Sequence, residues 1–465
     1  MGNKVLALYD FASKQEYIYR TSKIKEISGA SALMSGMYRK FVDILKEAGI
    51  SLKYDVESVF SLNGFTNDEN SDGEVLYDGG GNLMVIWKDE NKYKEANKTI
   101  SVYLLKKAPA LTLVSCCVNV TGDFENDRKS LYEKNALRKN QYPAFDMPAV
   151  TPFTQIDPMT FLPVTHKDEK KSISQSSDRY SKTQTYEKGE NKNGEFNEDE
   201  GMLAVIYIDG NSMGNKLQSC KSDKYDDGVG KLRGFSKQVN DFYVVGPVKS
   251  IEDSGYIFRK IIGGGDEITL MCKAEDAFKI MQMYFESLRK NSIKVDNRTF
   301  ECTSCAGIAV FHAKSPFNVA YDIAEAACEQ AKKKAHEKDG NYFSFYYCHS
   351  GITNVFDTLH ENEQEHASGK PYGIDDIDKF EKMQKLLNAA GRANVKNLGA
   401  AAQSGNSKYK FEIERVNAYL PKNSSKLTGE ESEMKLVYDM SEFYDLWFAK
   451  NSSEAKEEKD DEKNA

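Results

Sequence analysis

Residues 261–270 read Ile261-Ile262-Gly263-Gly264-Gly265-Asp266-Glu267-Ile268-Thr269-Leu270 and decide the fold, because apolar residues flank a glycine turn that ends in two adjacent carboxylates. The pattern is typical of a β-hairpin, since glycine permits the positive φ angles of a tight turn. Two neighbouring acids repel each other unless a cation neutralises them, and carboxylate oxygens suit Mg²⁺ or Mn²⁺. A plain solvated turn is the simpler alternative.

A second stretch supplies another carboxylate at the end of an apolar run. Residues 203–214 read Leu203-Ala204-Val205-Ile206-Tyr207-Ile208-Asp209-Gly210-Asn211-Ser212-Met213-Gly214. The apolar part predicts a buried central strand with Asp209 at its exit. The small, polar turn Gly210–Gly214 offers free backbone N–H groups to phosphates. The alternative is an ordinary aspartate that caps a turn.

A third element follows the hairpin. The alanines and Cys328 in residues 324–334 recur at helical spacing and predict a helix that packs on a sheet, although most lysines on such a helix are simply solvated. Gly340-Asn341 and an aromatic strand over Tyr342–Tyr347 come next. A strand ending in Asp, an acidic hairpin, a strand over Cys302–Phe311 and then this helix follow the order found in palm domains of nucleotide cyclases.

Residues 201–348 resemble the palm of GGDEF-type cyclases, and more closely the second palm of the large polymerase/cyclase subunit of type III CRISPR effectors. Asp209-Gly210-Asn211-Ser212-Met213-Gly214 resembles that family's Asp-Gly-Asp-Asn-Met-Gly, and Gly264-Gly265-Asp266-Glu267 resembles its Gly-Gly-Asp-Asp. Ser304–Ile308 resembles the strand after the hairpin. Asn211-Ser212 and Glu267 depart from the pattern, and the longer arm of Glu267 alters the expected metal geometry.

The resemblance implies roles for individual residues. Asp209, Asp266 and Glu267 would be catalytic, and the same three residues with the Gly210 carbonyl would hold two Mg²⁺ or Mn²⁺ ions. Lys332 falls where cyclases place a lysine for the triphosphate. The implied nucleotide-binding residues are Gly210, Asn211, Ser212, Met213, Gly214, Gly264, Gly265 and Lys332.

An internal repeat points to a second palm, and repeats define architecture. Val5–Phe11 parallels Ala204–Gly210, and Tyr77–Trp87 parallels the hairpin over residues 262–271. In this alignment Asn82 stands at the position of Asp266, and Leu83 replaces Glu267. The first copy is therefore predicted to be degenerate and to have lost its metal carboxylates.

The first copy offers a place for an acceptor nucleotide. Joining two nucleotides needs one bound as donor and another held with its 3′ hydroxyl in line, and two palms in one chain would supply both. Lys23–Ser31 resembles the segment after the first strand of the family's first palm, although Gly29 and Ser31 are equally explained as a small patch for helix packing. The implied acceptor residues are Asp10, Gly29, Ser31, Gly80, Gly81 and Asn82.

The expected fold is therefore α+β, with two ferredoxin-like palms of βαββαβ type that form an intrachain pseudo-dimer, followed by a helical domain. We expect a degenerate first palm over 1–125, a connector over 126–200 with a disordered loop over 165–200, and a catalytic palm over 201–350. Apolar residues at helical spacing in Ile374–Ala390, Tyr409–Leu420 and Lys435–Phe448 predict a thumb-like helical domain over 351–450. The charged stretch 451–465 is expected to be a disordered tail.

Composition narrows the function classes. The chain has 465 residues, enough for several domains, and a formal net charge of −8, which favours mononucleotide substrates over long nucleic acids. It shows no apolar run of about 18 residues and no leader, so we expect a cytoplasmic protein without membrane contact. Cys302 and Cys305 form a lone pair with no second pair at ligand spacing, so no zinc is expected. Larger family members carry a zinc module and a His-Asp nuclease module. We expect neither here, because residues 152–163 contain no cysteine and the sequence has no His-Asp pair.

The sequence therefore predicts a metal-dependent nucleotidyltransferase that condenses NTPs, most readily ATP, into a cyclic di- or oligonucleotide messenger of antiviral defence. The expected partners are NTP, with CRISPR-type or downstream effector proteins and an activating RNA as further candidates. Two alternatives stay open. In the first alternative, the chain is a palm subunit of a type III CRISPR-like ribonucleoprotein that binds guide or target RNA and partner subunits. In the second, it is a catalytically silent nucleotide sensor.

Overall fold

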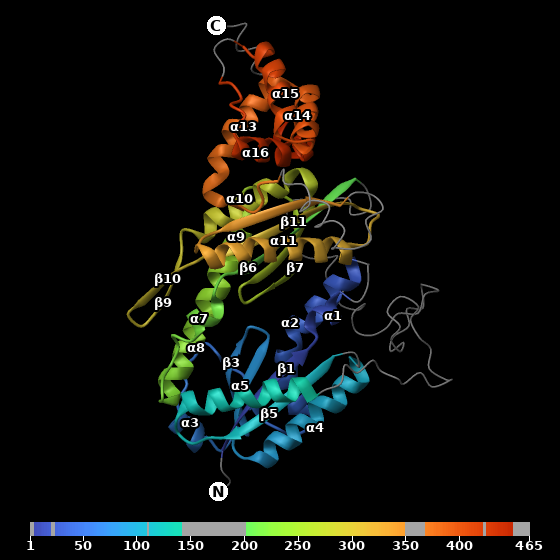
Figure 1. The fold of residues 1–465 in the computed structure, drawn as a ribbon. Helices are drawn as coiled ribbons and strands as arrows, with labels where there is room; N and C mark the ends of the chain where they lie inside the picture. The colour runs from blue at the N-terminus through green and yellow to red at the C-terminus, as the bar shows by residue number, and fades with distance from the viewer. Residues whose placement is uncertain are drawn as a thin grey trace, which may run out of the picture.

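The computed structural model describes residues 4–19, 24–108, 111–141, 201–348, 368–421 and 425–449. Two β-sheets with their helices form two palms, and a group of helices follows at the C-terminal end (Figure 1). The predicted α+β architecture is therefore confirmed. The loop over 165–200 and the tail over 451–465 lie outside the described residues. No helix in the described part of the chain is long and apolar enough to cross a membrane.

The first palm is built on a five-stranded sheet with the strand order β2-β3-β4-β1-β5. β1 lies between β4 and β5 and pairs antiparallel with both. Strands β1, β3, β4 and β5 with the helices between them give the predicted βαββαβ order. The elements are β1 (Val5–Ala12), α1 (Lys14–Ile18), α2 (Ile24–Glu47), β2 (Leu52–Lys53), α3 (Leu62–Asn67), β3 (Gly73–Gly79), β4 (Asn82–Trp87), α4 (Glu90–Lys107), β5 (Thr112–Asn119) and α5 (Phe124–Gln141).

The second palm repeats this arrangement in a six-stranded sheet with the order β13-β12-β11-β6-β8-β7. β6 pairs antiparallel with β8 and β11, as β1 does with β4 and β5. The elements are β6 (Met202–Gly210), α7 (Met213–Leu217), α8 (Tyr225–Asn240), η1 (Asp241–Val245), α9 (Gly246–Asp253), β7 (Phe258–Gly264), β8 (Glu267–Lys273), η2 (Ala274–Asp276), α10 (Ala277–Leu288), β9 (Ser292–Val295), β10 (Arg298–Glu301), β11 (Ser304–His312), α11 (Phe317–Glu337), β12 (Tyr342–Tyr347) and β13 (Tyr372–Gly373).

The first palm extends further along the chain than the expected boundary at residue 125. Helix α5 packs on β5 and β1, as α11 packs on β11 and β6 in the second palm. Residues 126–141 were expected to belong to the connector, yet Asp127, Arg128 and Asn135 of this helix are buried. The first palm therefore reaches at least Gln141.

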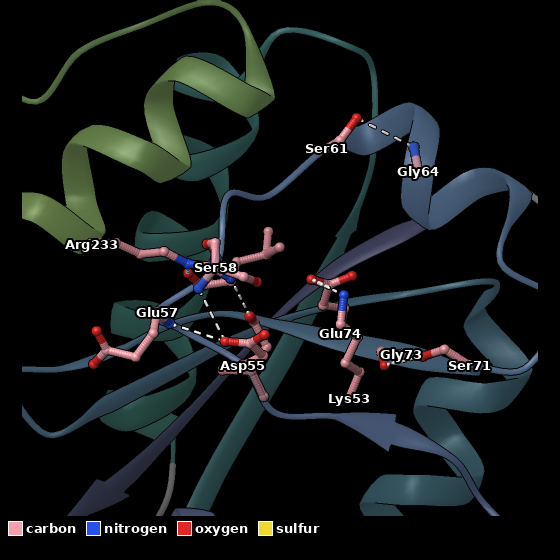
Figure 2. Close-up of polar contacts among 12 residues, drawn as sticks. Lys53, Asp55, Glu57, Ser58, Ser61, Gly64, Ser71, Gly73, Glu74 and Arg233 are labelled. Atoms are coloured by element: carbon pink, nitrogen blue, oxygen red, sulfur yellow. Dashed lines mark hydrogen bonds and ion pairs between the residues drawn. The ribbon is translucent and has the colours of Figure 1, made fainter.

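The two palms contact each other through α8 of the second palm. Arg233 of α8 donates hydrogen bonds to the backbone carbonyls of Leu76 and Val75 on β3, at 2.9 and 2.8 Å, and to the carbonyl of Ser58 at 2.5 Å (Figure 2). The Tyr225 hydroxyl donates to Asp127 on α5 at 2.5 Å. One apolar core cluster also includes residues of both sheets. The predicted pseudo-dimer therefore forms within one chain.

The C-terminal helices are η3 (Ile374–Asp376), α13 (Ile377–Ala390), α14 (Arg392–Gln403), α15 (Asn406–Tyr419), α16 (Glu431–Glu442) and η4 (Tyr444–Phe448). Three predicted helical segments are confirmed, and α14 was missed. A buried ion pair ties this unit to the second palm, since Lys370 Nζ lies 3.5 Å from Asp439 of α16 and donates to the Phe345 carbonyl of β12 at 2.9 Å.

Candidate functional site

The acidic site lies where β6 ends beside the hairpin turn between β7 and β8. Strand pairing sets Asp209 opposite Glu267, and Gly264 opposite Glu267 on the other side. Gly265 and Asp266 form the turn, and Gly265 has a φ of +66°, which an L side chain rarely adopts. The structure therefore brings the three predicted carboxylates to one corner of the sheet.

Gly210 is required by the position of Asp266. A Cβ atom at residue 210 would lie 2.7 Å from Asp266 Cβ and 2.9 Å from Asp266 Oδ2. The Gly210 N–H donates to the Asp266 carbonyl at 3.2 Å. The Asp266 side chain therefore lies directly over the backbone that follows Asp209, a close approach that only glycine allows.

Lys332 faces this corner from α11. Its ammonium group forms an ion pair with Asp209 and lies 3.2 Å from Glu329 on the same helix. The helix approaches the sheet closely at Gly307 of β11, where any Cβ would collide with the backbone of Ala324 and Cys328. The predicted lysine is thus held beside the predicted metal ligand.

The acidic site repels negative charge. Burial, followed by the nearby Asp209 carboxylate, raises the pKa of Asp266. Burial and the charges of Asp209 and Asp266 raise the pKa of Glu267 to about 7. Burial opposes the charge on Lys332, yet its contact with Asp209 raises the lysine pKa. Carboxylates with raised pKa values beside a cation are typical of functional sites.

The turn after Asp209 is anchored at Asn211 and exposed at Ser212 and Gly214. Asn211 is buried, its side-chain amide donates to the Gly340 carbonyl at 2.8 Å, and its backbone N–H donates to the Thr303 carbonyl at 2.9 Å. Asn211 therefore anchors the turn, while Ser212, with a φ of +55°, and Gly214 are exposed. The Met213 methyl group packs against Gly210. Gly264 lies at the end of β7 beside the turn.

The residues fit divalent metal ions, although no group of three or more acidic, histidine or cysteine side chains in the described residues is close enough to cage a metal by itself. A buried oxygen of Glu267, Oε1, has no hydrogen-bond partner. Mg²⁺ is commonly held by one or two carboxylates together with substrate phosphates and water, so a complete protein cage is not needed. Asp209, Asp266, Glu267 and the Gly210 carbonyl are the groups that would hold the ions.

In the first palm, strand pairing at the corresponding corner shifts the predicted alignment of the two hairpins by one residue. Asp10 pairs with Asn82 and Gly79 pairs with Asn82, just as Asp209 and Gly264 pair with Glu267. Gly81 therefore stands at the position of Asp266, and Asn82, not Leu83, stands at that of Glu267. The alignment was wrong because the glycine run Gly79-Gly80-Gly81 gives no residue that fixes its register.

Two lysines surround Asp10 in the first palm. Lys14 Nζ lies 2.9 Å from the buried Asp10 carboxylate and donates to the Gly81 carbonyl at 2.7 Å. Lys139 of α5 also forms an ion pair with Asp10. The Asn82 amide donates to the same carboxylate at 3.0 and 3.2 Å in the orientation that satisfies both groups. The predicted acceptor residues Asp10, Gly80, Gly81 and Asn82 therefore meet at a site that already contains positive charge.

Lys139 is the structural counterpart of Lys332, and sequence reasoning missed it. Each lysine lies fifteen residues after the phenylalanine that begins its helix, Phe124 or Phe317, and each pairs with the aspartate at the end of the central strand. Comparing the two helices from their first residues would have found the pair. Gly29 and Ser31 lie near the start of α2, with Gly29 buried and Ser31 half-buried.

Comparisons with known proteins agree with this geometry. Residues 202–341 match the family described as Cas10/Cmr2, second palm domain. Similar solved structures include the apo Csm1-Csm4 cassette, with a TM-score of 0.54 and 14% identity over 96% of this chain and 69% of that chain. The cassette in complex with cA4 and the Csm1-Csm4 subcomplex of the type III-A CRISPR-Csm interference complex both match with a TM-score of 0.53 and 14% identity, over 94% of this chain and 69% of theirs.

The comparison with curated proteins gave no match. At 14% identity the solved structures show a shared fold. The family match shows that residues 202–341 are similar to the second palm domain of Cas10/Cmr2. The predicted resemblance to the palm-domain subunit of type III CRISPR effectors is therefore confirmed.

Proposed function

We propose that this chain, with its Cas10/Cmr2-type second palm, is a metal-dependent nucleotidyltransferase that condenses ATP into a cyclic oligonucleotide and releases pyrophosphate. The observation that carries the proposal is the corner at which Asp209, Asp266 and Glu267 meet beside Lys332. Solved structures with the same fold include Csm1-Csm4 cassettes in complex with cA3 and cA4, which supports adenine nucleotides as the class to test first.

The residues of the acidic site would have distinct roles in the reaction. The 3′ hydroxyl oxygen of one nucleotide forms a bond with the α-phosphorus of another, the bond from that phosphorus to pyrophosphate breaks, and Asp266 or Glu267 accepts the hydroxyl proton. Bound divalent ions would neutralise charge on the attacking and leaving oxygens. Lys332 and the exposed turn at Ser212 and Gly214 would hold the triphosphate. Asn211 keeps that turn in place through Gly340.

The acceptor nucleotide would bind at the first palm. Gly80 of the first-palm turn and Gly265 of the acidic turn are neighbours, since a Cβ on Gly265 would lie 3.7 Å from Gly80 Cα. The corners that contain Asp10 and Asp266 therefore lie on adjoining hairpins of the two palms. This arrangement would give one catalytic centre per chain.

Mass spectrometry of the products tests the proposal. The protein is incubated with each NTP separately and with mixtures, in Mg²⁺ or Mn²⁺, beside an Asp266→Ala/Glu267→Ala variant whose fold is checked by its melting temperature. We expect a cyclic product from the wild type only, and none in the presence of EDTA. An equal amount of product from the double variant would refute the assignment of these acids.

A second candidate function is that of a palm subunit in a type III CRISPR-like ribonucleoprotein. The match to a subcomplex of the type III-A interference complex favours it, because that protein works with partners. If the purified chain binds ATP but forms no product, adding co-purified RNA and protein partners separates a partner-activated enzyme from a silent nucleotide sensor. Product that appears only with the partners favours the subunit, and binding without product in every case favours the sensor.

A further inference from the structure

The short helix α1 lies where the two palms meet (Figure 1). It spans Lys14–Ile18 and is followed by Tyr19, directly after the strand that carries Asp10. Its first residues face different palms. Lys14 contacts the first palm, whereas Gln15 and Tyr19 contact the second.

Lys14 fixes the hairpin turn of the first palm. Its ammonium group donates to the Gly81 carbonyl at 2.7 Å, and the same carbonyl accepts a hydrogen bond of 2.6 Å from the Tyr38 hydroxyl of α2. Gly81 has a φ of +74°, and a Cβ there would collide with Lys14 Nζ. The turn over Gly80 and Gly81 is therefore tied to both α1 and α2.

Gln15 and Tyr19 reach the catalytic palm. The Gln15 side-chain amide donates to Glu325 at 3.1 Å and to the Tyr321 hydroxyl at 3.4 Å, both on α11. Tyr19 stacks on Tyr321 with ring centroids 3.6 Å apart. Because α11 also carries Lys332, α1 joins the first-palm turn to the helix that faces the acidic site.

The first-palm turn in turn supports the acidic turn. Gly80 is a neighbour of Gly265, the residue before Asp266, since a Cβ added to Gly265 would be in van der Waals contact with Gly80 Cα at 3.7 Å. A shift of the first-palm turn therefore changes the space available to Gly265 and Asp266.

We propose that Lys14, Gln15 and Tyr19, which we call the inter-palm brace, position the acidic hairpin of the second palm from the first palm. The brace consists of positioning residues, because its contacts reach Asp266 through Gly81, Gly80 and Gly265, and reach Lys332 through α11. An effect of the brace on metal affinity rests on the proposed function. An effect of the brace on the local stability of the acidic hairpin does not depend on that function.

Lys53 provides a matched control for Lys14. Both lysines pair with a carboxylate whose side chain is 5% exposed on the same sheet, Lys14 with Asp10 and Lys53 with Glu74, the second at 3.2 Å (Figure 2). Glu74 lies near the start of β3, at the opposite end from the hairpin turn. The two lysine-to-methionine substitutions therefore each remove one ion pair with a buried carboxylate, Asp10 keeping Lys139, and of the two lysines only Lys14 contacts the turn.

Hydrogen–deuterium exchange in the full-length chain tests the brace without metal or turnover. We expect Lys14→Met and Gln15→Ala to speed amide exchange over residues 262–269 by about 2- to 10-fold, the factor expected for one lost hydrogen bond, while Lys53→Met leaves it unchanged. Lys14→Arg should restore slow exchange because it keeps a cationic donor. Equal exchange of this segment in the Lys14→Met and Lys53→Met variants would overturn the proposal.

A second variant controls for instability caused by the buried Asp10 carboxylate, which keeps only Lys139 as an ion-pair partner in Lys14→Met. Asp10→Asn/Lys14→Met removes that charge together with Lys14, and at temperatures where melting shows this variant to be folded, exchange over residues 262–269 should still be fast. Normal exchange in this folded variant would also overturn the brace. If the wild type binds no Mn²⁺ while exchange responds as expected, the brace stands and the metal-dependent function falls.

Discussion

The two palms share a fold but contain opposite charges at the same corner. The second palm gathers three carboxylates and one lysine, whereas the first gathers one carboxylate and two lysines. Corresponding positions of the first and second palms are Asp10 and Asp209, Phe11 and Gly210, Gly81 and Asp266, Asn82 and Glu267, and Lys139 and Lys332. In the first palm a lysine ammonium occupies the place that an acid has in the second.

The difference indicates how one copy of a repeat can keep its fold without binding metal. A buried carboxylate needs a cation, which either the protein or the solution supplies. In the first palm Lys14 and Lys139 supply it, so Asp10 is satisfied without a metal. In the second palm Lys332 forms an ion pair with Asp209 but with neither Asp266 nor Glu267, and the Oε1 atom of Glu267 has no hydrogen-bond partner. The second corner is therefore the one that favours metal ions.

The largest expected effect comes from replacing, one at a time, the two aspartates that occupy corresponding positions in the palms. Asp209→Asn should lower product formation by at least about 100-fold, because it removes a group expected to act on charge in the transition state. Asp10→Asn, at the proposed acceptor site, should lower product formation much less than Asp209→Asn, because no metal is expected there. It should also cost about 1–3 kcal/mol of stability, because it removes a buried hydrogen-bonded charge. Steady-state rates and thermal melting of both variants measure the contrast. Loss of activity in both variants to the same degree would break the distinction between the palms.

Gly210→Ala should have the next largest effect. The added Cβ would lie 2.7 Å from Asp266 Cβ, so Asp266 must move. Overpacking of this kind typically costs about 1–3 kcal/mol, and a misplaced reacting group lowers the rate about tenfold or more. Mn²⁺ affinity and initial rates are the measurements. Gly230→Ala on α8 is the control outside the site, since a Cβ there meets nothing within 4 Å. Equal effects from the two substitutions would refute this steric role.

Metal affinity should rise with pH. Burial and neighbouring carboxylates raise the pKa of Asp266 and bring that of Glu267 to about 7, so both groups hold protons near neutrality before metal binds. Cation binding then displaces protons, and the affinity changes by up to about tenfold per pH unit for each proton released. Calorimetric titration with Mn²⁺ at pH 6, 7 and 8 measures this. The dependence of Mn²⁺ affinity on pH should be weaker in Glu267→Gln. A pH-independent affinity in the wild type would contradict the raised pKa values of the two carboxylates.

The smallest expected effect concerns the stability of the metal-free protein. Because the folded-state pKa of Glu267 lies above its unfolded value, the folded state binds more protons between about pH 4.5 and pH 7, and stability falls as pH rises through this window. Glu267→Gln should therefore raise the melting temperature more at pH 8 than at pH 5. A variant that melts below the wild type at pH 8 would show that the acid is not under repulsion.

The sequence predicted the elements of the second palm well because their patterns are local. The apolar run before Asp209 and the glycine turn before Asp266 lie within β6 and the β7–β8 hairpin. It predicted less where polar residues are buried by tertiary contacts. Helix α5 resembled a connector because its buried face includes Asp127 and Asn135. Helix α14 was missed because Arg392–Gln403 is dominated by small residues that give a weak apolar pattern.

Long-range pairs account for the rest of what was missed. Lys139 lies far from Asp10 in the sequence, and only the packing of α5 on β1 and β5 brings them together. Lys14 follows Asp10 closely, but nothing local indicates that it binds the turn at Gly81. The register between the hairpins of the two palms depended on a run of glycines, which no side chain distinguishes. The sequence therefore located the acids and Lys332, and the structure was needed to find Lys14 and Lys139, which pair with Asp10.

The most direct test of the central claim is anomalous diffraction at the manganese edge from crystals grown with Mn²⁺ and a non-hydrolysable ATP analogue. We predict manganese peaks beside Asp209, Asp266 and Glu267, with none beside Asp10, where Lys14 and Lys139 already supply positive charge. A manganese peak at Asp10, or ordered nucleotide in the second palm without metal at these acids, would contradict the account.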